Sequence, residues 1–350
     1  MRLLMLPRYG VLGASSRVRM YQYLPALESA GVEVAVSPLF GDGYVRALYE
    51  SRHSLAEIAL GYMRRIRAQL STARYDVVWI EKELLPWLPA FAERIRGNPR
   101  VVVDYDDAVF HRYDQHRSAL VRRLLGQRID AVMRHADLVT AGNDYLAERA
   151  RGAGCPRVEW LPTVVDLERY APNPERDAGA PVVIGWIGSP ATAHYLQPLA
   201  SVIAGLEGTH AVRAVAVGAR PDQVAGTPFE AVAWSEAEEA SLVASFDIGI
   251  MPLQDSPWER GKCGYKLIQY MACGLPVVAS PVGVNTRIVQ HGENGFLAGS
   301  QDEWRLAIGR LLADADMRNR MGRSGRRQVE EAYSLQAQAP RLVAMLESLQ

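Results

Sequence analysis

Short apolar runs that alternate with amphipathic stretches constrain the fold of this chain more than any other feature of its 350 residues. Short apolar runs between turn residues are typical of buried strands, and the longer stretches carry the spacing of helices. Strand and helix in regular alternation predict βαβ units and parallel sheets. We expect strands at 3–6, 32–36, 77–80, 101–103 and 138–140, and again at 182–186, 212–217, 248–251 and 276–279.

The alternation starts again near Pro181, after a segment rich in proline and charge at 170–177. That restart predicts two doubly wound α/β domains. We place the first at 1–168, a linker at 169–180 and the second at 181–334, followed by a last helix within 335–350. Ligands of such folds bind outside the carboxyl ends of the strands, so the residues that follow each strand are the first candidates for a site.

The composition is that of a globular protein with no excess of charge, with 39 basic and 39 acidic residues. Nothing in that balance indicates nucleic acid. Cys155, Cys263 and Cys273 are too few for a disulfide framework and have no zinc-site spacing, so we expect a reducing, cytoplasmic compartment and no metal. The first half is mildly basic, with 24 Lys and Arg against 20 Asp and Glu in residues 1–170.

Two stretches of that half, 55–74 and 112–135, combine arginines with interleaved Leu, Ile and Met. Two interpretations fit this pattern: peripheral docking to anionic lipid at the inner face of a membrane, or an ordinary solvated helix face. Nucleic-acid binding fits less well, because no aromatic stacking platform accompanies the arginines.

The segment 259–280 carries the most specific motif. Gly261 and Gly264 predict a turn, a helix follows at about 264–273, and Gly274 and Pro276 predict its end. Free N–H groups at a helix start bind anions, and lysines at 262 and 266 add positive charge there. The alternative is an ordinary helix whose glycines only turn the chain. A Walker phosphate loop is excluded, because Ser256 and Cys263 occupy positions that it reserves for Gly and for Ser or Thr.

Carboxylates follow the predicted strand 101–103. Asp104 and Asp106 spell D-x-D, the metal and donor motif of the GT-A glycosyltransferase fold, but a GT-A domain does not explain the second half. Asp106 and Asp107 follow the expected carboxyl end of this strand, and helix capping is one interpretation of them. His111 and His116 are candidate proton carriers, with an ordinary surface position as the alternative.

Two loops that follow first strands of the domains are further candidates. The loop 10–19 lacks G-x-G-x-x-G, which makes nicotinamide binding a weak interpretation, but its small residues precede Arg17. The loop 188–194 contains Ser189, a good N-cap, and Pro190, a good first helical residue. Phosphate binding and a plain helix start fit this second loop equally.

Several of these runs together resemble the family 4 retaining glycosyltransferases. The run 269–280 resembles the family's E-A-M-A-x-G-x-P-V-V-A-S, and 292–297 resembles its G-x-N-G-[FL]-L loop. Upstream, 136–140 and 161–166 resemble its A-D-x-V-x and P-x-x-V-D runs. The resemblance covers most of the chain, in the family's order.

This resemblance implies a GT-B architecture, in which two Rossmann-like domains face each other across a cleft. It implies that the first domain binds the acceptor, that the second binds a nucleotide-sugar donor, and that the last helix crosses back to the first domain. The implied activity is metal-independent hexosyl transfer with retention, in polysaccharide or glycoconjugate synthesis, to a glycan, lipid-linked or small-molecule acceptor. No cofactor is implied beyond the nucleotide-diphosphate sugar substrate.

Two departures from the family pattern affect the site. The family has Glu at the positions of Gly261 and Gln269, and it often has Arg and Lys in the loop that is 188–194 here. Lys262 and Lys266 are therefore candidates to replace those basic residues. The candidate catalytic residues are Asp106, Asp107, Lys262 and Lys266, and the candidate donor-binding residues are Gly13, Ala14, Arg17, Gly188, Ser189, Gly261, Lys262, Cys263, Gly264, Tyr265, Lys266 and Gln269.

Three other functions on the same fold stay open at this point. A GT-B epimerase would need acid and base carboxylates in the cleft, and a GT-B phosphorylase would need a lysine that binds pyridoxal phosphate. A protein that binds a sugar nucleotide without catalysis is suggested by Gln269 in place of Glu.

Overall fold

The structure is a computed structural model, and it describes residues 1–49, 54–172 and 180–350. Contacts divide the chain into two units. The first contains Met1–Val164, Gly261–Cys263 and Gln338–Gln350, and the second contains Val165–Arg260 and Gly264–Ala337. The predicted linker at 169–180 includes 173–179, which lie outside the described residues.

The described strands of the first unit form one six-stranded parallel sheet in the order β2-β1-β3-β4-β5-β6. The strands are β1 (Arg2–Leu6), β2 (Glu33–Val36), β3 (Val77–Glu81), β4 (Arg100–Tyr105), β5 (Leu138–Ala141) and β6 (Val158–Trp160). The helices are α1 (Ala14–Arg19), η1 (Tyr21–Tyr23), α2 (Leu24–Ser29), α3 (Asp42–Tyr49), α4 (Leu55–Leu70), η2 (Thr72–Arg74), η3 (Ala90–Glu93), α5 (His111–Asp114), α6 (Ala119–Leu125), α7 (Arg128–His135) and α8 (Asp144–Ala153).

Apolar side chains cover both faces of this first sheet, as parallel pairing requires. One face packs under α7 and α8 around Val103 and Val139. On the other face the ring of Tyr23 meets Trp79 edge-on, with centroids 6.2 Å apart. The last helix, α17 (Leu335–Glu347), joins this unit from Gln338 onward, and the backbone oxygen of Leu349 accepts a hydrogen bond from Arg100.

The second unit contains a second six-stranded parallel sheet among the described residues, in the order β12-β11-β10-β7-β8-β9. Its strands are β7 (Val182–Ile187), β8 (Val212–Val217), β9 (Phe229–Val232), β10 (Ile248–Met251), β11 (Val277–Ala279) and β12 (Gly295–Leu297). Its helices are η4 (Pro190–Leu199), α9 (Ala200–Glu207), α10 (Pro221–Val224), α11 (Glu239–Ala244), α12 (Pro257–Arg260), α13 (Tyr265–Ala272), α14 (Asn285–Ile288), α15 (Gln301–Ala313) and α16 (Ala315–Ala332).

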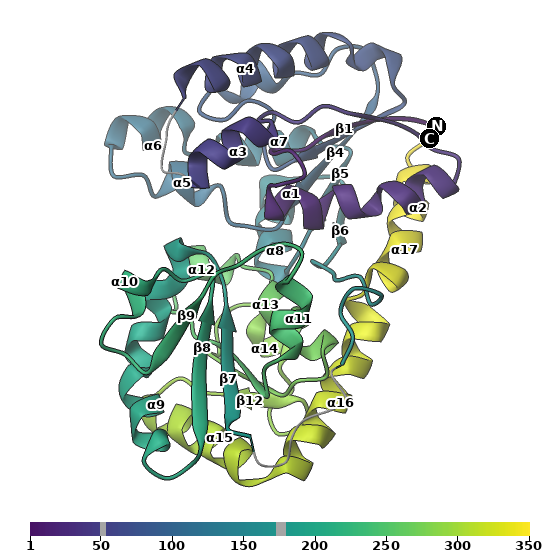
Figure 1. The fold of residues 1–350 in the computed structure, drawn as a ribbon. Coiled ribbons are helices and arrows are strands. Elements are labelled where there is room, and N and C mark those ends of the chain that lie inside the picture. The colour runs from purple at the N-terminus through teal and green to yellow at the C-terminus, as the bar shows by residue number, and fades with distance from the viewer. Residues whose placement is uncertain (50–53, 173–179) are drawn as a thin grey trace. The chain divides into compact units, whose positions relative to one another are not determined.

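Helices cover both faces of the second sheet as well (Figure 1). Helices η4, α9 and α15 cover one face, and α13 packs on the other beside α11 and α16. The predicted alternation of strands and helices is therefore confirmed in both halves, and so is the left-handed conformation of Gly274, with φ of 72°. Among the described residues, no helix combines the length and the apolar character that crossing a membrane requires.

Three strands were not predicted, and two amphipathic stretches each contain more than one helix. The missed strands β6, β9 and β12 lie at or next to the sheet edges, and their sequences are short and interrupted by Glu or Gly. The stretch 16–30 contains α1, η1 and α2 rather than one helix, and 119–135 breaks at Gly126 and Gln127 between α6 and α7. Sequence periodicity continues across such breaks, because both pieces bury the same side of the chain.

Two glycines that pair across β7 and β10 are required by the packing of the second unit. Gly185 lies opposite Gly249 in the register. A Cβ atom on Gly185 would lie 2.0 Å from the ring of Phe246, and one on Gly249 would lie 2.4 Å from the ring of Tyr270. The two rings, with centroids 6.2 Å apart, occupy the space that side chains would otherwise fill.

We therefore expect Gly185→Ala to destabilise the protein by roughly 1–3 kcal/mol or more, because the ring of Phe246 has to move in a packed core. The control is Gly205→Ala, in the exposed α9 position where a Cβ meets nothing within 4 Å, and this change should stabilise by roughly 0.5–1 kcal/mol. Urea unfolding of both variants measures these differences. Equal stabilities would contradict the proposed packing.

Candidate functional site

Charged residues gather where β3 and β4 of the first unit end. Glu81, the last residue of β3, pairs in register with Asp104 of β4, and Lys82 follows with a left-handed backbone, φ 62°. That conformation is uncommon for a residue with a side chain, and it is typical of positions where the surroundings determine the backbone. The amide of Lys82 donates to the oxygen of Asp104 at 2.8 Å, which continues the ladder past the strand end.

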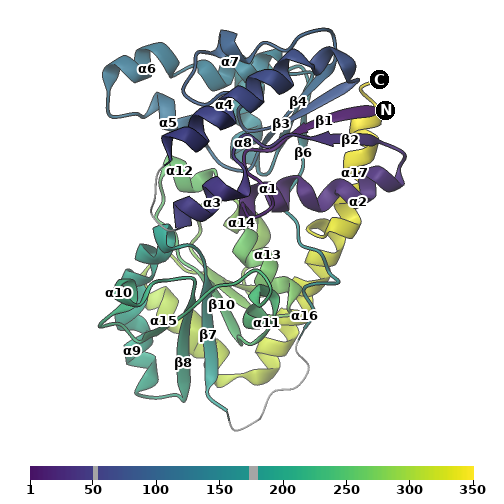
Figure 2. The same cartoon turned by 45° about the horizontal axis from the view of Figure 1, so that its top comes forward.

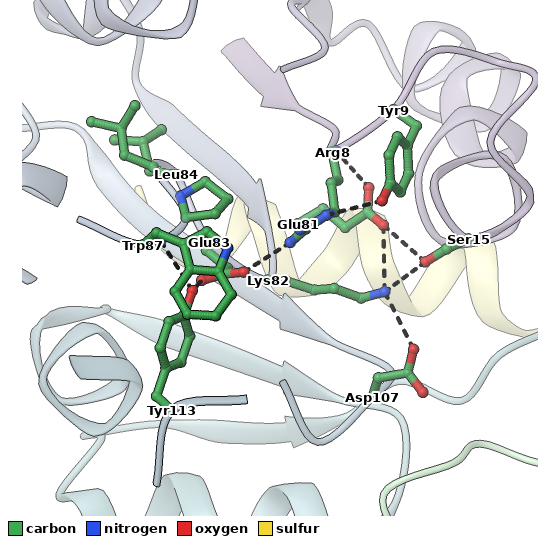
Figure 3. A network of polar contacts seen from close by, with 12 residues as sticks. Arg8, Tyr9, Ser15, Glu81, Lys82, Glu83, Leu84, Trp87, Asp107 and Tyr113 are labelled. Atoms are coloured by element: carbon green, nitrogen blue, oxygen red, sulfur yellow. Dashed lines mark hydrogen bonds and ion pairs between the residues drawn. The ribbon is translucent and has the colours of Figure 1, made fainter. Parts of the chain in front are cut away.

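The ammonium group of Lys82 is the centre of this cluster (Figure 3). Its Nζ lies 2.8 Å from Oδ1 of Asp106, 3.5 Å from Oδ2 of Asp107 and 3.9 Å from Oε1 of Glu81. It also donates to Oγ of Ser15 at 2.8 Å, and only 4% of Lys82 is exposed. One buried cation thus balances several carboxylates at the carboxyl end of the sheet.

The two predicted carboxylates differ in their proton affinity. Burial opposes ionisation of Asp106, but the charges of Lys82 and Arg19 outweigh it and lower the pKa of that group. Burial raises the pKa of Asp107. The positive charge of Lys82 lowers this pKa, and the negative charge of Asp106 raises it further. The side chain of Asp107 is 32% exposed, against 12% for Asp106. Asp107 is therefore the more exposed carboxyl group of the pair and the one with the higher proton affinity.

Buried ion pairs anchor the strands that carry this cluster. Arg19 of α1 donates to both oxygens of Asp104, at 2.9 and 2.5 Å, and Thr140 donates to the same carboxylate at 2.6 Å. A second group joins Glu83 to Arg8 at 2.8 Å and to Arg128, which also contacts Glu93. Every formal charge in these pairs has an opposite partner, as burial requires.

The predicted loop of the first unit lies beside the cluster. Gly13 is the N-cap of α1, and a Cβ there would lie 2.3 Å from Cβ of Tyr9, so the position accepts only glycine without rearrangement. Ala14 is exposed at the helix start, and Arg17 contacts the oxygen of Val11 at 3.5 Å. The hydroxyl of Ser15 reaches the site, since it lies 3.0 Å from Asp106.

The histidines have fixed partners in the structure. The ring of His111 lies 2.8 Å from Asp114 through Nδ1 and 2.8 Å from the hydroxyl of Tyr145 through Nε2. Nδ1 of His116 accepts from the amide of Ser118 at 3.1 Å. Neither Asp106 nor Asp107 caps α5, whose N-cap is Phe110, so their alternative role as helix caps is wrong.

The turn 261–263 belongs to the first unit. The amide group of Asn143 donates to the oxygen of Lys262 at 2.9 Å, and the thiol of Cys263 lies 3.1 Å from the oxygen of Asp106. A Cβ on Gly261 would lie 2.4 Å from Cβ of Ala108. Burial raises the pKa of the Cys263 thiol, so Cys263 packs as a protonated thiol beside the carboxylates. The charge of Lys262 acts on Asp107 and opposes the rise of its pKa.

Helix α13 of the second unit begins at Tyr265, with Gly264 as its left-handed N-cap at φ 68°. Lys266 is in its first turn, and its Nζ lies over the ring of Trp186 at 4.6 Å from the centroid. A Cβ on Gly188 would lie 2.9 Å from that same Nζ. The ammonium group of Lys266 therefore lies next to the loop that follows β7, where the sequence lacks the basic residues of the family.

Gln269, a predicted donor-binding residue, is buried. Gln269 is 2% exposed, and its amide nitrogen donates to the hydroxyl of Tyr170 at 2.8 Å. Tyr170 in turn contacts Glu239, whose other oxygen accepts from the indole N–H of Trp234 at 2.7 Å. Ser189 precedes η4 with Pro190 in its first turn, but its hydroxyl makes no capping hydrogen bond.

Sequence reasoning missed several residues that surround the predicted ones. In the first unit these are Ser15, Glu81 and Lys82, and in the second unit they are Trp186 and Glu239. Lys82 had a usable signal, because it is one of three lysines in a chain with 39 basic residues and it directly follows a predicted strand. Trp186 was identified only as the end of a strand. Among the described residues, no group of three or more His, Cys, Asp or Glu side chains has the arrangement to hold a metal ion.

Two parallel α/β units of this kind, with polar clusters after the strand ends, define the GT-B class of glycosyltransferases. Sucrose-phosphate synthase from Thermosynechococcus elongatus superimposes with a TM-score of 0.76 at 17% identity, over 100% of this chain and 99% of that one. The Anabaena protein Alr3699/HepE, solved in complex with UDP-glucose, superimposes with a TM-score of 0.72 at 17% identity, over 99% and 100% of the two chains.

Family models agree with this class. The model of the 4-like glycosyl transferase domain matches residues 11–163, and that of the glycosyl transferases group 1 matches residues 181–314. The two matches together cover most of the chain, and the chain belongs to the group 1 glycosyltransferases with a 4-like first domain.

Curated relatives match over shorter stretches. The MMP alpha-(1->4)-mannosyltransferase of Mycolicibacterium hassiacum is 34% identical over 120 residues, which are 32% of this chain and 27% of that protein. The N-acetyl-alpha-D-glucosaminyl L-malate synthase of Bacillus anthracis is 32% identical over 77 residues, 21% of this chain and 20% of that protein. The match thus spans about a quarter of these relatives or less.

The Lys82 cluster makes a prediction about stability. Lys82→Met leaves buried carboxylates without their cation, so the free energy of unfolding at pH 7 should fall by roughly 3–5 kcal/mol. The lowered pKa of Asp106 contributes stability above its unfolded pKa of about 4, and this contribution is lost as the pH falls through the folded pKa. The deficit of the variant should therefore shrink in acid.

Urea unfolding at pH 7, and at the lowest pH below about 4 at which the wild type stays folded, measures this deficit. Lys82→Arg is the control, because it keeps the positive charge and should lose less stability than Lys82→Met. A deficit of the same size at both pH values would show that packing, rather than charge balance, explains the effect.

Proposed function

We propose that this protein transfers a hexosyl group from a nucleotide-diphosphate sugar to an acceptor, with retention of configuration and without a metal ion. Membership of the group 1 family supports the transfer reaction. The position of Lys266 beside the loop after β7 is the observation that supports donor binding by the second unit. A cation and free backbone N–H groups at the carboxyl ends of parallel strands favour a bound diphosphate.

The proposed donor site uses the residues predicted from the sequence. Lys266 and the backbone of Ser189 would contact the diphosphate, beside Gly188, whose own N–H donates to the oxygen of Val217. A cation in the first turn of α13 is unfavourable by roughly 0.3–1 kcal/mol, because the positive end of the helix dipole faces it. A bound diphosphate reverses the sign of that interaction, since each positive group then faces a negative one. Gln269 would contribute by holding Tyr170 rather than through an exposed amide.

The proposed acceptor site is at the carboxyl end of the first sheet. Asp106 and Asp107 would accept hydrogen bonds from sugar hydroxyls, with Lys82 balancing their charge. In transfer with retention, the acceptor oxygen bonds to the anomeric carbon on the face that the diphosphate leaves. The leaving diphosphate takes the acceptor proton, so the protein's task is positioning and charge stabilisation.

The acceptor that we propose is a glycan or a lipid-linked sugar, in polysaccharide or glycoconjugate synthesis. We also propose a peripheral contact with anionic membrane lipid in the cytoplasm. Both parts are supported by the arginine-rich stretches 55–74 and 112–135 of the first unit. A membrane contact would bring a lipid-linked acceptor to the carboxylates of the same unit.

A screen of sugar nucleotides tests the donor assignment. At saturating concentration, at least one UDP-, GDP- or ADP-sugar should raise the melting temperature of the protein, because a ligand that binds only the folded state stabilises it. Donor hydrolysis or transfer should persist in excess EDTA. Loss of activity in EDTA that manganese restores would contradict metal independence, and binding without turnover would favour a non-catalytic sugar-nucleotide binder.

The two lysines of the 261–266 segment give a sharper prediction. Lys266→Met should lower kcat/KM by roughly 10²-fold if Lys266 stabilises charge on the leaving diphosphate, and Lys262→Met should do the same if Lys262 shares this role. The unliganded Lys266→Met protein should keep its stability, because the change removes a cation from the positive end of the α13 dipole.

Arg213→Met is the matched control for the lysine variants. Arg213 is an exposed cation near the start of β8, at the opposite end of the strands from the loop after β7. Its loss should leave kcat/KM unchanged. Normal donor affinity and kcat/KM in both lysine variants would assign the diphosphate to backbone N–H groups instead.

A further inference from the structure

Helix α4 of the first unit faces its apolar side chains outward. Its exposed positions span an arc of about 140° at 100° per residue. Seven of these eight exposed positions carry apolar side chains, and the eighth carries Arg67. We call this arc the outer face of α4, and it consists of Leu55, Ala56, Ala59, Leu60, Met63, Ile66, Arg67 and Leu70.

The large side chains of the outer face are well exposed. The exposed fractions are 81% for Leu55, 60% for Met63 and 52% for Leu70, and Leu60 and Ile66 are at 46% and 44%. Single exposed leucines are ordinary in soluble proteins, but a continuous apolar stripe on one helix marks a surface that binds something.

The inner face of α4 buries an arginine and a glycine. Arg65 is fully buried there and donates to the oxygen of Pro7, while its Nε and Nη1 have no partner. Gly61 packs so closely that a Cβ would lie 2.6 Å from the oxygen of Leu39. A helix that served only the core would turn its leucines inward and its arginines to water. The orientation of α4 therefore exposes apolar area that folding of this unit does not use.

Neighbouring segments extend this apolar surface. The hydroxyl of Tyr62 donates to the oxygen of Pro86 at 2.5 Å, and Gln69 donates to the oxygen of Ala92 at 2.8 Å, so the segment 86–92 runs along α4. Trp87 and Phe91 in that segment are 50% and 70% exposed. The ring of Trp87 lies 5.9 Å from that of His116, which leads into α6 with its own exposed pair, Leu120 and Leu124. Figure 1 shows α4 along the edge of this unit, and in Figure 2, where the top is turned forward, α4 lies across its front.

Arginines flank these apolar side chains. The only acidic residue in α4 is Glu57, α6 has none, and Glu93 is buried against Arg128. The surface is therefore apolar in its middle and basic around it. The basic residues on α4, the segment 94–96 and the region of α6 are Arg64, Arg67, Arg94, Arg96, Arg117, Arg122 and Arg123.

We propose that the outer face of α4 inserts into the headgroup region of an anionic lipid bilayer, with the helix lying along the membrane surface. An apolar stripe with basic flanks is the chemistry of interfacial helices, in which apolar insertion and attraction to anionic headgroups act together. This inference rests on the membrane contact of the proposed function and assigns it to one helix face.

Charge complementarity selects lipid over a second copy of this chain. A symmetric dimer through this face would bring the same arginines of two copies close together, and like charges across an interface oppose association. Anionic lipid headgroups are opposite in charge to the whole rim. The lipid surface is thus the occupant that satisfies both the apolar centre and the basic edge.

Vesicle co-sedimentation of the full chain tests this assignment. The probes are vesicles of phosphatidylcholine alone and vesicles with phosphatidylglycerol in equal parts, at low and high salt. Wild-type protein should bind the anionic vesicles, and more weakly at high salt. Met63→Glu should weaken the partition coefficient roughly tenfold or more, since it removes the Met side chain that would insert into the bilayer and adds a negative charge. Met63→Ser should have a smaller effect in the same direction.

Leu306→Glu is the matched control, because Leu306 is 62% exposed on α15 of the second unit and Met63 is 60% exposed. It introduces the same charge and should leave vesicle binding unchanged. Melting temperature and donor binding of each variant verify that the fold is intact.

Three results would overturn the inference. If wild type binds and Met63→Glu binds equally well, the membrane contact stands but α4 does not make it. If wild type does not bind anionic vesicles at all, both the inference and the proposed membrane contact are wrong, while transfer to a soluble acceptor can still be measured. If wild type is a dimer that Met63→Glu converts to monomers without affecting vesicles, a second copy covers this face.

Discussion

Parallel pairing within each sheet is the constraint on which the rest of this structure depends. Both described sheets contain only parallel strands, so each connection has to return across the sheet and each strand ends at the same edge. Residues far apart in sequence, such as Ser15, Lys82 and Asp107, therefore meet at one edge of the first sheet. In the second unit, the same constraint brings Gly188 and Lys266 together.

The carboxyl-terminal edges of the two sheets differ in the charged groups that they present. In the first unit, a buried lysine balances three carboxylates, and paired arginines fix the strands behind them. Such clusters add little net stability, because desolvation offsets attraction, but losing one partner is costly. They hold side chains in one geometry, which suits recognition of sugar hydroxyls. In the second unit, the ammonium group of Lys266 rests on the ring of Trp186, next to Gly188.

In the proposed function, transfer, positioning and membrane contact are divided among different surfaces of the chain. The second unit presents a cation beside a glycine-containing loop, and the first unit presents carboxylates at its sheet edge and an apolar helix face elsewhere. A lipid-linked acceptor would explain why the carboxylates and the outer face of α4 belong to the same unit. The physical link is proximity, because a surface that holds the protein at the bilayer also raises the local concentration of its acceptor.

The sequence by itself determined the parallel α/β class, the two-part organisation, the family, and the turn and helix around 261–274. These features depend on local spacing and on residues with special backbone behaviour, such as Gly264 and Gly274. The candidate residues near the strand ends could be named for the same reason. The edge strands β6, β9 and β12 were not predicted, because short half-polar segments carry little periodic signal.

Tertiary structure alone decided which charges pair and which face of a helix is buried. Residues that are distant in sequence meet only in the fold, so nothing local to Lys82 shows that Asp106 and Ser15 surround it. The periodicity of α4 shows that one face is apolar, but not whether that face points inward. The buried Arg65 settles the orientation, and only the packed structure places it.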